Sequence, residues 1–143
     1  MILSDTTLNI ISSSAELITS NDVKISKRMY EILFSKFPIM EKLFFNAPED
    51  QHMRLAEALS IYAVNINKIE ILKPALEVIV KRHATVNIKK SHYPMVGIAL
   101  IQAIEDVLEE KATIELIDAW REAYQFLAHI LMNMDKEYAT IKA

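Results

Sequence analysis

The chain of 143 residues contains no cysteine and a single glycine, Gly97. Without cysteine it can form no disulfide, no thiolate-ligated iron–sulfur cluster or zinc site, and no thiolate nucleophile. Strand-rich folds use glycine at hairpins and bulges, and nucleotide-binding loops require it at fixed positions. The scarcity of glycine therefore excludes a P-loop and a dinucleotide fingerprint, and it predicts an all-α fold.

Long apolar runs and an excess of positive charge are also missing. No uninterrupted apolar run approaches the ~18 residues of a membrane-spanning helix, and the N-terminus lacks the pattern of a signal peptide. We therefore expect a cytoplasmic protein without a membrane span. The net charge of −3 argues against a nucleic-acid-binding protein that works through a broad basic surface. The length suits one domain with one core.

Apolar residues recur at helical spacing along most of the chain, and capping residues and prolines divide it into segments. The first helix is predicted to begin at Ser4–Thr7, and Pro38 is predicted to end the second helix and open a short third one. Later helices are predicted at about 49–66, from Pro74 to near His83, from Tyr93 to 108, and from Thr113 to about 134. The pattern predicts about seven helices joined by short loops.

His83 ends one of these helices on the stripe formed by Leu76, Ile79 and Val80. Neutral imidazole binds iron, zinc or copper readily, so His83 is a candidate metal ligand. A partly buried histidine that hydrogen-bonds to the backbone would show the same spacing. The stripe alone leaves both interpretations open.

Several stretches resemble the bacterial haemoglobins of the flavohaemoglobin and Vitreoscilla type. They are Tyr30–Phe34 with Pro38, Phe44–Asn46, Ile61–Ile66, His92–Gly97 and Asp118–Tyr124. The resemblance extends from about Ser4 to Tyr138 and includes the spacing between the stretches. It implies a globin fold of seven to eight helices around haem b. It also implies a single globin domain over residues 1–143, with no reductase or output domain.

The resemblance assigns roles to individual residues. His83 matches the proximal iron ligand, and Phe44 matches the phenylalanine that packs against the haem face. Tyr30, Gln51 and Leu55 match residues on the distal side of the haem. Tyr93 and Glu137 match residues on its proximal side. The loop before Gln51 is shorter than in some flavohaemoglobins.

The residues themselves are compatible with these roles and with simpler ones. Gln51 and Leu55 are four residues apart and share a helix face, as expected for a pocket with one polar group. A surface glutamine in a first helical turn would give the same pattern. Tyr30 shares a face with Phe34 and Phe37, which also fits a core tyrosine.

Glu137 lies on the same register as Ile130 and Met134, so its carboxylate needs a partner or faces solvent near the helix end. The resemblance implies that the partner is His83, whose second ring nitrogen would donate to the carboxylate. Such a contact makes a haem iron more electron-rich. A frayed surface glutamate is the alternative.

The remaining histidines are predicted to lie outside the iron site. His52 should point away from the pocket, although it is the alternative distal ligand if its helix rotates. His92 is expected at the surface, and His129 is expected to be a packing or surface histidine rather than a ligand.

The resemblance implies high-affinity O₂ binding at ferrous iron, with Tyr30 and Gln51 as hydrogen-bond donors to the bound gas. It further implies dioxygenation of NO to nitrate, with Tyr30, Gln51, Tyr93 and Glu137 as the functional set. NO and CO are expected as further haem ligands, and turnover would need a separate reductase. The alternative functions are O₂ storage or delivery and, less favoured, a gas-sensing or interaction module. The protein is expected to be a monomer or a homodimer.

Overall fold

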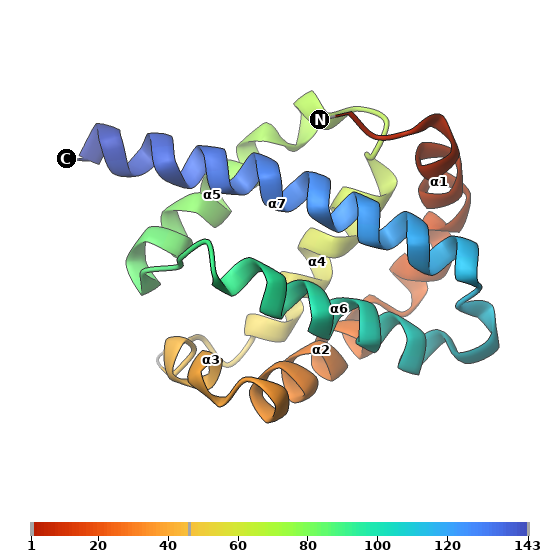
Figure 1. Cartoon of the computed structure of the whole chain (residues 1–143), viewed down its shortest axis with the longest axis horizontal. Coiled ribbons are helices and arrows are strands. Elements are labelled where there is room, and N and C mark those ends of the chain that lie inside the picture. The colour runs from red at the N-terminus through yellow and green to blue at the C-terminus, as the bar shows by residue number, and fades with distance from the viewer. Residues whose placement is uncertain (1, 46, 143) are drawn as a thin grey trace.

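The computed structural model describes residues 2–45 and 47–142. The described residues form seven α-helices and one 3₁₀ turn, with no strand (Figure 1). The elements are α1 (Asp5–Ser20), α2 (Asp22–Lys36), α3 (Pro38–Leu43), α4 (Gln51–Val64), α5 (Ile69–Val86), α6 (His92–Leu108), η1 (Glu109–Lys111) and α7 (Ile114–Lys142). The predicted all-α class is confirmed.

The helix boundaries follow from capping groups and proline. Ser4 Oγ accepts a hydrogen bond from the Thr7 N–H at 3.2 Å, which starts α1. Thr113 Oγ1 accepts from the Leu116 N–H at 3.1 Å and starts α7. Pro38 occupies the first position of α3, where a missing N–H costs nothing. These three predicted boundaries are confirmed.

Helix α5 is longer at both ends than the sequence pattern predicts. It begins at Ile69, so Pro74 lies in its interior rather than in its first turn. The proline removes one backbone hydrogen bond, whereas Leu72 and Leu76 on either side of it are buried in the core. The helix passes His83 and ends at Asn87, which has a left-handed backbone conformation (φ 59°, ψ 49°).

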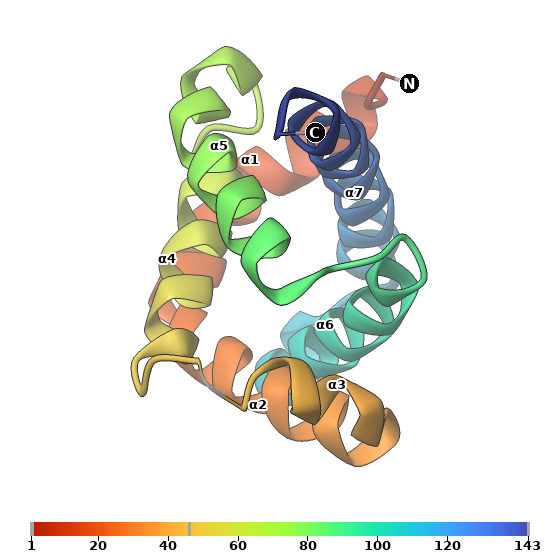
Figure 2. The ribbon, with the colours of Figure 1, turned by 90° about the vertical axis from the view of Figure 1, so that its left-hand side faces the viewer.

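The helices form two flanks joined by a base. In Figure 2, α4 and α5 run along one side, α6 and α7 along the other, and α2 and α3 lie across the bottom. Side chains from most helices meet in one core, whose fully buried members include Ile11, Ile18, Ile25, Met29, Leu33, Met40, Ile66, Ile104 and Trp120. Packing of this core sets how α5, α6 and α7 are oriented toward one another.

Two tyrosines set the position of α7 relative to its neighbours. The Tyr62 hydroxyl donates to the Ala123 carbonyl at 2.6 Å, and the Tyr62 ring lies 6.4 Å from that of Trp120, measured between ring centroids. The Tyr124 hydroxyl donates to the Tyr93 carbonyl, also at 2.6 Å. Helix α7 is thereby tied to α4 and to the first turn of α6.

Gly97 is required for this close approach. A Cβ atom at position 97 would lie 2.7 Å from Cε2 of Tyr124, closer than real contacts allow. The glycine therefore gives the Tyr124 ring the space to reach the Tyr93 backbone. The single glycine of the chain serves helix packing rather than a turn.

The start of α1 is held against α7 by Glu122. Its carboxylate accepts hydrogen bonds from the Ser4 N–H at 2.9 Å and from Thr7 Oγ1 at 2.5 Å. These hydrogen bonds lower the pKa of Glu122 below its ordinary value. The N-terminal segment is thus fixed to the helix that carries residues of the site described next.

Candidate functional site

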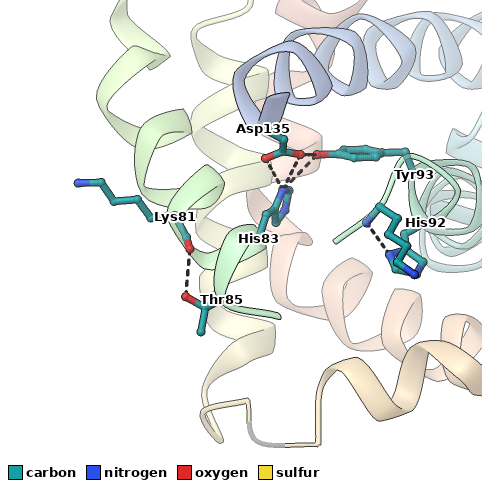
Figure 3. Close-up of polar contacts among 7 residues, drawn as sticks. Lys81, His83, Thr85, His92, Tyr93 and Asp135 are labelled. Carbon is teal, nitrogen blue, oxygen red and sulfur yellow. Dashed lines mark hydrogen bonds and ion pairs between the residues drawn. The ribbon is translucent and has the colours of Figure 1, made fainter. Parts of the chain in front are cut away.

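His83 meets two polar side chains behind its ring. Its Nδ1 atom lies 3.1 Å from the Tyr93 hydroxyl oxygen and 3.3 Å from Asp135 Oδ1 (Figure 3). The Tyr93 hydroxyl in turn donates a short hydrogen bond to Asp135 Oδ2. Helices α5, α6 and α7 each supply one member of this group, which we call the proximal triad.

The triad orients the imidazole. With Tyr93 donating to Asp135, the oxygens around Nδ1 act as acceptors, so the neutral ring carries its proton on Nδ1 and leaves Nε2 with a lone pair. No hydrogen bond to Nε2 occurs within residues 2–45 and 47–142. This is the arrangement of a metal-ligating histidine whose second nitrogen is held by a carboxylate.

The environment also favours the neutral imidazole. Burial lowers the pKa of His83, and the nearby Asp135 carboxylate only partly opposes that effect. Burial, together with Asp135, raises the pKa of Tyr93 well above its ordinary value. The tyrosine therefore stays protonated and remains a donor to Asp135, and the histidine is in the form that binds a metal.

Asp135 takes the place that the sequence analysis gave to Glu137. The contact predicted between Glu137 and His83 is wrong, because the Glu137 side chain is exposed and Asp135 contacts His83. Asp135 follows the buried residues Ala128 and Leu131 by seven and four positions, on one helix face. Two residues further on, Glu137 is rotated about 200° around the helix.

A second polar pair joins α2 and α4. Gln51, the first residue of α4, donates a hydrogen bond from Nε2 to the Tyr30 hydroxyl of α2 at 3.2 Å. Burial raises the pKa of Tyr30, so its hydroxyl keeps its hydrogen. Leu55 lies one turn after Gln51 and is half-buried.

Aromatic rings surround this pair. The Tyr30 ring centroid lies 5.4 Å from that of Phe44 and 5.6 Å from that of Phe34. A cavity of about 560 Å³ opens beside Tyr30, Phe34, Phe44 and Gln51. Phe44, at the end of α3, thus contacts the same tyrosine that Gln51 holds.

The other histidines only partly match expectation. His52 lines the cavity beside Gln51, although the sequence predicts that it points away from it. His92 was expected at the surface, but it is 9% exposed, and its Nδ1 accepts the Lys89 N–H at 2.9 Å. The loop before α6 folds back over His92, which explains its burial. His129 is exposed, which is one of the two positions that the sequence left open for it.

These residues fit a haem group. His83 offers one nitrogen atom, and the described part of the chain contains no cluster of three His, Asp or Glu side chains that could hold a metal ion. A single imidazole suits an iron whose in-plane ligands come from a porphyrin. Half-buried apolar side chains such as Phe44 and Leu55 provide a surface for a flat apolar ring.

Among the described residues, no helix combines the length and apolar character needed to cross a membrane.

Comparison with known sequences points to one family. The globin family model matches residues 27–131. A globin-like protein of Aquifex aeolicus is 42% identical over 135 residues, which cover 94% of this chain and 96% of that protein. A flavohaemoprotein of Rhodopirellula baltica is 37% identical over 137 residues, which cover 93% of this chain but only 33% of that protein. The chain thus spans one third of the flavohaemoproteins that it matches.

Solved structures give the same result. A carbene transferase engineered from a candidate nitric oxide dioxygenase of Rhodothermus marinus superposes with a TM-score of 0.94 and 36% identity, covering 99% of this chain and 100% of the other. A bacterial globin from Campylobacter jejuni superposes with a TM-score of 0.87 and 24% identity, covering 96% and 99%. The predicted globin fold is confirmed, and the chain belongs to the globin family.

Proposed function

We propose that this globin holds haem b through His83 Nε2, binds O₂ at the ferrous iron, and supports the dioxygenation of NO to nitrate. The observation that carries the proposal is the proximal triad, in which Nδ1 of His83 contacts both Tyr93 and Asp135. Sequence relatives that are flavohaemoproteins, and the structural relative derived from a candidate nitric oxide dioxygenase, support the same reaction.

Haem supplies the iron at which O₂ binds and reacts. On the proximal side, Asp135 accepts a hydrogen bond from the Nδ1–H group of His83 and makes the imidazole a stronger electron donor. Tyr93 holds the carboxylate in place through its hydroxyl, so the carboxylate cannot turn away to solvent. This polarisation suits reductive O₂ chemistry better than simple storage.

On the distal side, Tyr30 and Gln51 have different roles in hydrogen bonding. Because Gln51 donates to the Tyr30 oxygen, the Tyr30 hydrogen remains available to a bound gas that carries partial negative charge. A hydrogen bond to a charged group contributes roughly 1.5–3 kcal/mol. We therefore expect slow O₂ release, which gives NO time to react.

Conversion of NO and O₂ to nitrate consumes one electron. In this proposal a reductase supplies that electron. In the proposal, the chain's own residues orient the His83 imidazole and retain the bound gas.

The cofactor and its ligand are tested by spectroscopy. Purified protein supplied with haem should show a strong Soret band, and His83→Ala should lose it or shift it markedly. His129→Ala, which removes an exposed histidine on α7, is the matched control and should leave the band unchanged. Failure of the wild-type protein to take up haem would overturn the proposal.

The reaction is tested by mixing the O₂-saturated ferrous protein with NO and measuring nitrate. One nitrate per haem is expected, with prompt oxidation of the iron. Rapid O₂ release with little nitrate would instead indicate O₂ storage or delivery and would overturn the dioxygenase assignment.

A further inference from the structure

Positive charge is concentrated in the segment around His83. Residues 78–104 contain four basic residues and no acidic one, whereas the whole chain has 16 basic and 19 acidic residues. The remaining 116 positions therefore hold 12 basic and 19 acidic side chains, a net charge of −7 against +4 for the segment. An acidic protein thus carries a basic region where its candidate iron ligand lies.

The fold adds a lysine from α7 to this region. Lys90 from the loop before α6 and Lys136 from α7 both line a cavity of about 200 Å³, together with Tyr93 and Asp135. Both lysines are exposed. The cavity therefore places two cations at the surface beside the two residues that contact His83.

Further cations extend the region. Lys81, Arg82 and Lys89 are exposed on the last turns of α5 and on the following loop. Figure 3 shows Lys81 extending away from the proximal triad, so we do not count it with the cavity lysines. We call Lys89, Lys90 and Lys136 the proximal basic face.

Acidic side chains offset this charge only weakly. Asp135 lines the cavity but is engaged by Tyr93 and His83. Glu137 follows Lys136 in the sequence, and its side chain is exposed. It is therefore a second carboxylate of α7 close to these lysines. The net charge of the face remains positive.

We propose that the proximal basic face is the docking surface for a small acidic electron-carrier protein of the ferredoxin or flavodoxin type. The inference rests on the proposed function, in which each NO molecule consumes one electron. Transient redox complexes bury little area and depend on complementary charge to form quickly. Tyr93 and Asp135, which line the cavity, both contact His83, so a carrier docked here lies near the proposed iron ligand.

The first test measures binding without electron transfer. Oxidised [2Fe–2S] ferredoxin, an acidic carrier, is titrated into the haem-loaded protein at low ionic strength by calorimetry. The wild-type protein should bind it, and raising the salt concentration should weaken binding because exposed charges are screened. The double variant Lys90→Glu/Lys136→Glu should bind roughly tenfold more weakly, with little remaining salt dependence.

The matched control is Lys24→Glu/Lys36→Glu, which makes the same charge change at exposed lysines of α2. The affinity of this control variant for ferredoxin should stay within about twofold of the wild-type value, because only the overall charge of the protein changes and not the charge of the docking surface. An equal loss in both double variants, or no loss in either, would overturn the proposal. So would equally tight binding of basic cytochrome c or of phosphatidylserine vesicles to the same face.

The second test measures the rate at which reduced ferredoxin reduces the ferric protein in stopped flow. Lys90→Glu/Lys136→Glu should be slower at low salt, whereas reduction by dithionite should be unchanged. One nitrate per haem from the O₂-saturated ferrous protein, without ferredoxin binding, would refute the docking surface alone. Normal ferredoxin binding without nitrate would refute the proposed function alone.

Discussion

Replacement of Asp135 by asparagine should weaken the hold of the protein on haem. The carboxylate lies 3.3 Å from Nδ1 of His83 and receives the Tyr93 hydroxyl, so it fixes the ring and increases its donor strength. Loss of such a partner behind a metal-ligating histidine costs roughly 10–100-fold in metal affinity. That range corresponds to about 1.4–2.7 kcal/mol, since each tenfold change equals 1.36 kcal/mol. We expect faster haem loss by the same factor.

The assay is transfer of haem from the ferric protein to excess apomyoglobin, followed by absorbance. Glu137→Gln is the matched control because it neutralises a carboxylate on the same helix that is exposed and rotated away from His83. Its haem loss should equal that of the wild-type protein. If Asp135→Asn retains haem as firmly as the wild-type protein while Glu137→Gln does not, the assignment of the proximal carboxylate is wrong.

Three further predictions test the distal side, the packing of α7 and the pH dependence. Tyr30→Phe should accelerate O₂ release roughly 10- to 150-fold, the equivalent of 1.5–3 kcal/mol; stopped-flow displacement of O₂ by CO measures this, and an unchanged rate would contradict the distal argument. Gly97→Ala should lower the free energy of unfolding by roughly 1–3 kcal/mol in urea, because its methyl group would lie 2.7 Å from the Tyr124 ring; a cost as large in the Tyr124→Leu background would argue against this cause. The lowered pKa of Glu122 stabilises the fold above the ordinary carboxyl pKa and loses its effect as pH falls through the folded-state value. Wild-type protein should therefore lose more stability than Glu122→Gln on acidification from neutral pH, and equal losses would refute the role of that carboxylate.

Much of the fold could be predicted because helices leave local signals. A single glycine, helical spacing of apolar residues and the caps at Ser4 and Thr113 indicate the class and several boundaries without knowledge of tertiary contacts. Pro74 misled the prediction for α5, because a proline usually marks a first turn or a break. Here the buried neighbours of Pro74 keep the helix intact on both sides.

The proximal carboxylate could not be located from spacing alone. In a 29-residue helix with apolar residues on several faces, two registers differ by only one or two positions. The contacts of Trp120 with Tyr62 and of Tyr124 with Gly97 decide which face of α7 points toward His83. The spacing from Ala128 and Leu131 indicates that Asp135 faces the core, whereas the spacing from Ile130 and Met134 indicates that Glu137 does.

The burial of His92 also depended on tertiary structure. Its neighbour Tyr93 predicts a helix start, at which a polar first residue normally faces solvent. The left-handed Asn87 turns the loop back so that the Lys89 N–H reaches the His92 ring. A backbone reversal of this kind leaves no periodic pattern in the sequence.

The most direct test of the central claim is the iron–histidine stretching band in the resonance Raman spectrum of the ferrous, ligand-free protein. We predict that the wild-type band lies at a higher frequency than that of Asp135→Asn. We also predict that the band is absent in His83→Gly and returns when imidazole is added. An unchanged band in His83→Gly would show that another residue binds the iron and would contradict the account.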